Sequence, residues 1–103
     1  MKAINGYQKL IELGNMKYLE TSLIRLSRYS YDIKDYKFSN IYYQELDSIA
    51  SDNNLKREAI IRLMFGFEET NKELAVKYSE RVLESDKIDG RLVARAKIII
   101  ARS

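Results

Sequence analysis

The sequence contains no histidine, cysteine, proline or tryptophan, and only four of its 103 residues are glycine. Without cysteine and histidine, the chain cannot form disulfides, thiolate or imidazole metal sites, cysteine nucleophiles or histidine general bases. Without proline and with few glycines, little in the chain interrupts helices. No apolar run approaches the ~20 residues of a membrane span, and the first residues lack the apolar core of a signal peptide. We therefore expect a helical protein with neither a membrane span nor a cofactor.

What is present is typical of a folded helical domain. Hydrophobic residues make up 46% of the chain and charged residues 32%, with a net charge of +3. This chain is too apolar for a disordered tail, and its length allows one core or about three short repeats. Both signs of charge are mixed along the sequence, except for a basic stretch at the end: Arg91, Arg95, Lys97 and Arg102. These cations lack interleaved stacking aromatics, so we expect no nucleic-acid partner.

Short polar breaks divide the chain into segments whose apolar residues recur with the period of an amphipathic helix. The predicted helices cover residues 2–13, 16–32, 36–50, 55–69, 72–85 and 90–102. The first, third and fifth have one apolar face, whereas the second, fourth and sixth have apolar residues on two sides. This alternation is typical of stacked helical hairpins, in which every second helix contacts neighbours on more than one side.

Side chains of similar kind recur at a period of about 36 residues. In the odd-numbered segments they form three columns: Ala3, Ser39 and Ala75; Tyr7, Tyr43 and Ser79; Leu10, Leu46 and Val82. In the even-numbered segments they form two columns: Leu23, Ile60 and Ala96; Leu26, Leu63 and Ile99. A stack of repeats places equivalent side chains in equivalent surroundings, so this recurrence predicts a solenoid of helix pairs.

These residues resemble the tetratricopeptide repeat, a two-helix unit. The second-helix resemblance lies in Asp35, Tyr36, Ser39, Tyr43 and Leu46, and the first-helix resemblance in Leu23, Leu26, Ser27 and Ser30. The resemblance implies an all-α fold, a right-handed α-α superhelix or solenoid of about six antiparallel helices in a single domain, residues 1–103. It divides the chain into the second helix of one repeat (2–13), two full repeats (16–50 and 55–85) and the first helix of a further repeat (90–102). We therefore expect a piece of a longer bacterial array.

The resemblance also implies an inner groove, formed by first-helix residues that face away from the hairpin core. Carried over position by position, the groove consists of Thr21, Ile24, Arg28, Tyr31, Glu58, Ile61, Phe65, Glu68 and Lys97. Aromatic and aliphatic anchors beside charged residues suit an extended peptide or a helix, so we expect a protein or peptide partner. The alternative is that neighbouring first helices bury these side chains against one another.

The sequence favours a protein-interaction scaffold over an enzyme. Glu68 and Glu69 diverge by about 100° on a helix, so they cannot converge as an acid/base pair. The alternative function is a structural spacer within a larger multi-repeat protein, with no ligand of its own. The last segment, 90–102, is apolar on most sides, so self-association through exposed terminal helices is a further prediction. Looser, proline-free repeats are similar in style to those of bacterial cell-envelope proteins, which suggests that compartment.

Overall fold

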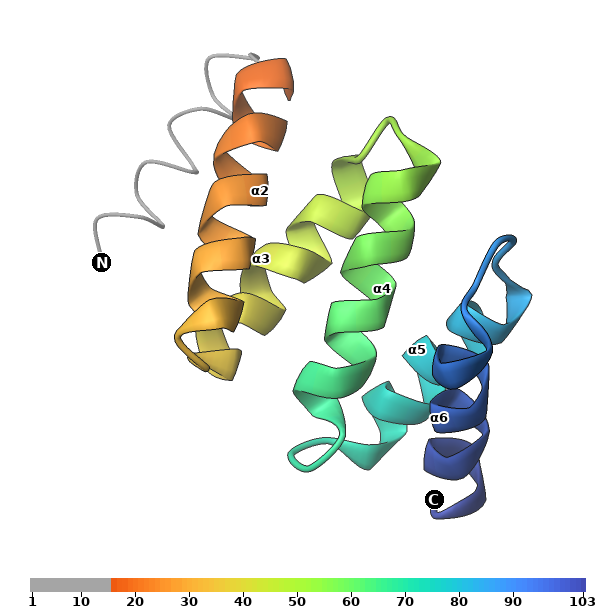
Figure 1. Ribbon diagram of the computed structural model, residues 1–103. Helices are drawn as coiled ribbons and strands as arrows, with labels where there is room; N and C mark the ends of the chain where they lie inside the picture. The colour runs from red at the N-terminus through yellow and green to blue at the C-terminus, as the bar shows by residue number, and fades with distance from the viewer. Residues whose placement is uncertain (1–15) are drawn as a thin grey trace.

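The computed structural model describes residues 16–103, which form five α-helices and, within that range, no strand (Figure 1). The helices are α2 (Met16–Asp32), α3 (Tyr36–Ile49), α4 (Asn53–Phe67), α5 (Lys72–Glu84) and α6 (Gly90–Ala101). Each coincides with a predicted segment to within two residues at either end. The predicted helix 2–13 lies outside the described residues. The all-α class is therefore confirmed for the described part of the chain.

Four of these helices begin at an Asp or Asn whose side chain caps the first turn. Asp35 and Asn71 accept hydrogen bonds from the backbone N–H three residues later, at 3.5 and 3.1 Å. Asp52 and Asp89 accept from the N–H two residues later, both at 2.7 Å. Such caps satisfy backbone donors that have no partner within the helix. The two caps that accept from three residues later, Asp35 and Asn71, are 36 positions apart, and the two that accept from two residues later, Asp52 and Asp89, are 37 positions apart. The helix starts therefore recur with the same period as the core columns.

A tight turn ends α2. The N–H of Lys34 donates to the carbonyl of Tyr31 at 3.0 Å, and the N–H of Asp35 donates to the carbonyl of Ser30 at 2.8 Å. These two bonds form a Schellman motif, which places its central residue in the left-handed region. That residue is Lys34, with φ of 62°.

Each helix packs mainly against the helices before and after it in the sequence. Ion pairs also join alternate helices: Arg28 of α2 with Glu58 of α4, Asp47 of α3 with Arg81 of α5, and Glu68 after α4 with Arg95 of α6. The alternate helices must therefore lie close enough for their side chains to meet. Ion pairs thus link the even-numbered helices α2, α4 and α6 to one another, and likewise the odd-numbered helices α3 and α5.

The recurring side chains make up much of the core. The buried members of the columns are Leu23, Ser39, Tyr43, Leu46, Ile60, Leu63, Ala75, Ser79, Val82, Ala96 and Ile99. Leu26 differs from its equivalents because it is only half-buried against the core. The hydroxyl of buried Ser79 donates to the carbonyl of Ala75 at 2.7 Å, and Ser27 bonds in the same way to Leu23. Apart from Leu26, the described members of the columns are thus alike in being buried, while Ala3, Tyr7 and Leu10 lie outside the described residues.

Helices α3 and α4 approach closely where Asn40 meets Gly66. The Asn40 side chain is 7% exposed, and its Nδ2 donates to the carbonyl of Gly66 at 3.2 Å. A Cβ atom added at position 66 would lie 2.0 Å from Oδ1 of Asn40. No such separation is sterically allowed, so the contact between these helices requires glycine at this position.

Candidate interaction surface

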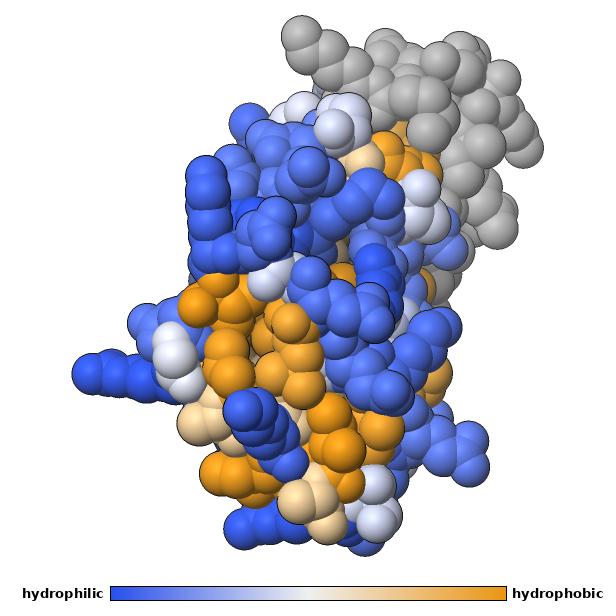
Figure 2. Space-filling model, turned by 90° about the vertical axis from the view of Figure 1, so that its right-hand side faces the viewer, coloured by the Kyte–Doolittle hydropathy of each residue, from blue (hydrophilic) through white to orange (hydrophobic). Residues whose placement is uncertain are grey.

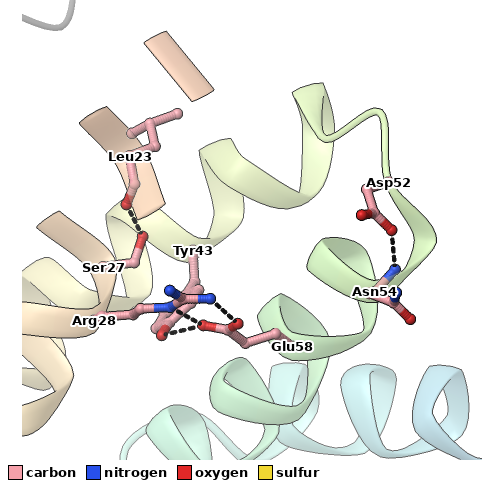
Figure 3. A network of polar contacts seen from close by, with 7 residues as sticks. All are labelled: Leu23, Ser27, Arg28, Tyr43, Asp52, Asn54 and Glu58. Carbon is pink, nitrogen blue, oxygen red and sulfur yellow. Dashed lines mark hydrogen bonds and ion pairs between the residues drawn. The ribbon is translucent and has the colours of Figure 1, made fainter. Parts of the chain in front are cut away.

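A polar network joins the first three described helices at two of the predicted groove residues, Arg28 and Glu58 (Figure 3). The Arg28 guanidinium donates from Nε and Nη2 to the two carboxylate oxygens of Glu58, at 2.9 and 2.7 Å. The hydroxyl of Tyr43 on α3 donates to the same carboxylate at 3.2 Å. This bidentate geometry fixes the orientation of both charged groups. Arg28 and Glu58 therefore neutralise each other across the gap between α2 and α4.

The ion pair shifts the pKa values of its members in the expected directions. Hydrogen bonding to Arg28 lowers the pKa of Glu58 from its ordinary value, against the opposing effect of burial. The same bond raises the pKa of Arg28. Burial, and next the charge of Glu58, raise the pKa of Tyr43. At neutral pH Glu58 is thus an anion, Arg28 a cation and Tyr43 a neutral donor.

Tyr31 of α2 contacts two tyrosine rings of α3 and the guanidinium of Arg62 on α4. Its ring meets those of Tyr36 and Tyr43 edge to face, with centroids 5.4 and 6.4 Å apart. The guanidinium carbon of Arg62 lies 4.6 Å from its ring centroid, which is cation–π geometry. Tyr31 is half-buried, so part of its ring packs inside the protein and part remains accessible.

A pocket of about 370 Å³ lies where α2, α3, α4 and α6 come together. Its lining consists of Tyr31, Tyr36, Phe65, Gly66, Glu68, Glu69, Thr70 and Arg95. Three of the predicted groove residues, Tyr31, Phe65 and Glu68, therefore share one concave surface. Aromatic side chains supply its apolar wall and the two carboxylates its polar edge. Such a combination suits one apolar side chain of a bound peptide.

One residue of this pocket, Arg95, belongs to the basic stretch at the end of the sequence. With Arg91 and Arg102 it forms a stripe of three arginines along one face of the last helix. In the structure Arg95 binds Glu68 with both ends of its guanidinium, including Nε to Oε1 at 3.1 Å. Arg91 and Arg102 are exposed. The stripe is therefore divided, because one of its three arginines links α6 to the end of α4.

The other predicted groove residues lie outside the pocket. Ile24 and Ile61 are half-buried and pack against the core, as do Tyr31 and Phe65. Thr21 on α2 and Lys97 on α6 are exposed. Part of each half-buried side chain thus packs against the core, and part remains exposed.

Sequence reasoning missed five residues of this pocket: Tyr36, Gly66, Glu69, Thr70 and Arg95. Tyr36 belongs to the second-helix pattern of the resemblance, and in the structure it lines the pocket. Arg95 is 27 positions from Glu68, a separation that follows no helical period. Opposite charges on alternate helices indicate that an ion pair could form, but they do not specify which residues meet.

Other kinds of site have little support in the described range. Between residues 16 and 103, no three acidic side chains are grouped so as to hold a metal ion. None of the five helices has the combined length and apolar character needed to cross a bilayer. Comparison with protein-family models, curated proteins and solved structures finds no match to this chain.

Proposed function

We propose that this chain is a protein-interaction module: a right-handed, tetratricopeptide-like stack of helix pairs whose even-numbered helices present a groove to a peptide. Three features support the stack. Neighbouring helices pack in sequence order, ion pairs connect alternate helices, and caps and buried side chains recur every 36 or 37 positions. Repeat proteins owe their stability to such nearest-neighbour packing, and their regular rows of helices form extended binding surfaces.

The pocket that contains Tyr31, Phe65 and Glu68 is the observation that carries the proposal. Its volume of about 370 Å³ is enough for a large apolar side chain. The pairs Arg28–Glu58 and Glu68–Arg95 supply polar groups on the even-numbered helices without adding net charge. A peptide would place an apolar or aromatic anchor against the rings, and its backbone would hydrogen-bond to the carboxylates.

The proposal can be tested without knowledge of the natural partner. A displayed library of random 16-residue peptides is selected for binding to the full chain, and the affinities of the selected peptides are measured by isothermal titration calorimetry. We expect Phe65→Ala to weaken binding by about 10- to 100-fold, because truncation of a central anchor costs about 1.4 to 3 kcal/mol. The matched control is Leu83→Ala, at a 37% exposed position on α5. Peptides that bind both variants as tightly as the wild type would contradict the proposal.

The second candidate is the structural spacer, which a specific observation favours. Arg28, Glu58 and Glu68 all form ion pairs with other residues of the same chain. If the even-numbered helices bind nothing, these contacts serve only to hold the helices at fixed spacing. The spacer predicts that Phe65→Ala lowers the melting temperature and changes no binding activity, and that an inert helical array can replace this chain in a larger protein.

A further inference from the structure

Helix α6 presents an apolar surface that no described helix covers. Ile98 is 41% exposed, and the exposed residues Ala94 and Ala101 lie one turn to either side of it. Val93 and Ile100 are half-buried on the same helix. Figure 2 looks onto the side of the molecule where α6 lies in Figure 1, and shows apolar side chains gathered across its lower half. Hydrophilic side chains border this patch and lie across it.

The charged residues of α6 itself are all of one sign. From Gly90 to Ser103 the sequence contains four basic residues and no acidic residue. Arg95 is neutralised by Glu68. Arg91, Lys97 and Arg102 form no ion pair with any residue of the described range. Lys97 is one helical turn from both Ala94 and Ala101, so this cation stands within the apolar surface.

This combination limits what can cover α6. An apolar partner that buried Lys97 would leave an unpaired charge without solvent, which is costly. A second copy of α6 would bring two sets of cations together, and like charges across an interface repel. A lipid surface would favour aromatic anchors on the apolar face, and α6 contains no aromatic residue. A partner with carboxylates beside its own apolar residues would both cover the apolar surface of α6 and pair with its cations.

We propose that the exposed surface of α6 binds an amphipathic helix of a partner protein that has acidic residues along the edges of its apolar face. One carboxylate of this helix pairs with Lys97, while its apolar side chains cover Ile98. The chain itself contains such packing, since the buried stripe of Ala75, Tyr78 and Val82 on the amphipathic helix α5 lies within the core. The inference does not rest on the pocket that contains Tyr31, Phe65 and Glu68.

The probe is a stapled, end-capped helical peptide with the sequence of residues 35–50. It has an apolar face and a net charge of −2, from one lysine and three carboxylates. The comparison peptide has Glu45→Lys and Asp47→Lys, which change its net charge to +2 and leave the apolar face intact. We expect fluorescence anisotropy at low salt to show at least about tenfold tighter binding of the acidic peptide. This ratio should shrink in 0.5 M salt as the charges are screened.

Variants of the chain locate the contact. Ile98→Glu should weaken binding of the acidic peptide at least about tenfold. Lys97→Glu should shift the binding preference of the chain toward the basic peptide. Ile41→Glu is the matched control, because Ile41 is 38% exposed but lies on α3. This variant should leave the acidic peptide's affinity within about twofold, since Ile41 does not belong to α6. Circular dichroism verifies that each variant is folded.

Several results would overturn the proposal. The acidic peptide could fail to bind the chain, or the chain could bind the acidic and the basic peptide with equal affinity. The acidic peptide could also bind the Ile98→Glu variant as tightly as the wild type. Dimerisation in sedimentation equilibrium that Ile98→Glu abolishes would assign the surface to a second copy of the chain. Co-sedimentation with phosphatidylserine vesicles that Ile98→Glu abolishes would assign it to a membrane.

Discussion

The close contact between Asn40 and Gly66 gives a sharp test of how α3 packs on α4. In an exposed helix, Gly→Ala stabilises by about 1 kcal/mol, because alanine has the higher helix propensity. At position 66 the new methyl group would lie 2.0 Å from Oδ1 and 3.0 Å from Cγ of Asn40. Asn40 is buried, so its side chain has little room to turn away. The steric cost should therefore exceed the gain in propensity.

The magnitude follows from what the methyl group displaces. Overpacking a core costs about 1 to 3 kcal/mol. Losing the bond from Asn40 to the Gly66 carbonyl while both groups stay buried costs about 1 to 3 kcal/mol more. After subtracting the propensity gain of about 1 kcal/mol, these costs sum to about 1 to 5 kcal/mol, and we expect Gly66→Ala to lower the free energy of unfolding by about 3 kcal/mol, the middle of this range. For a domain of this size, that corresponds to a melting temperature lower by about 12 to 24 °C.

The prediction also states that the effect of Gly66→Ala on stability reverses when Asn40 is replaced. In the background of Asn40→Ala the obstructing side chain is gone, so Gly66→Ala should stabilise by about 1 kcal/mol. Urea unfolding of the four proteins of this double-mutant cycle measures both effects. Gly90→Ala is the control, because a Cβ there meets nothing within 4 Å. If Gly66→Ala stabilises the wild type, or destabilises both backgrounds equally, this account of the contact is wrong.

Three further predictions concern the ion pair, a helix end and a cap. Because the pKa of Glu58 is lowered from 4.5, its stabilising effect is complete above that pH and is lost as the pH falls through the folded-state pKa. Glu58→Gln should therefore cost about 1 kcal/mol at pH 7 and almost nothing at pH 2 in urea titrations, and equal costs at both would refute the pairing. Lys34→Gly should raise the unfolding free energy by about 0.5 to 1 kcal/mol, since glycine favours positive φ, and a lower melting temperature would contradict the assigned turn. Asn71→Ala should lower the free energy of unfolding by about 1 kcal/mol, because α5 loses its N-terminal cap. An unchanged melting temperature would exclude that cap.

The helices could be predicted because local signals in the sequence agree with the packing. Polar breaks with Asp or Asn mark the helix starts, and no proline interrupts the segments between them. Helix α4 shows the limit: it was expected at 55–69, but spans Asn53–Phe67. The Asp52 cap sets its start, and at its end the N–H groups of Thr70 and Asn71 turn back to the carbonyl of Phe67. Such competition among backbone hydrogen bonds is not encoded in the apolar period.

The candidate site was only partly predictable for a different reason. Tyr31 and Phe65 emerged from helical geometry, because they lie off the core face of their own helices. The ion pair of Glu68 with Arg95 depends on how closely α6 approaches α4, which no single helix specifies. The same holds for Arg62 above the ring of Tyr31. Periodicity thus indicated which faces are accessible, whereas the pairing of charges across helices required the tertiary structure.

The most direct test of the central claim is the location of a bound peptide on the chain. An NMR titration of the ¹⁵N-labelled protein with a library-selected peptide reports this residue by residue. If the even-numbered helices form the binding surface, the largest shift changes will centre on Tyr31, Phe65 and Glu68. Changes confined to the exposed residues of α3 and α5, such as Ile41 and Leu83, would contradict the proposed groove.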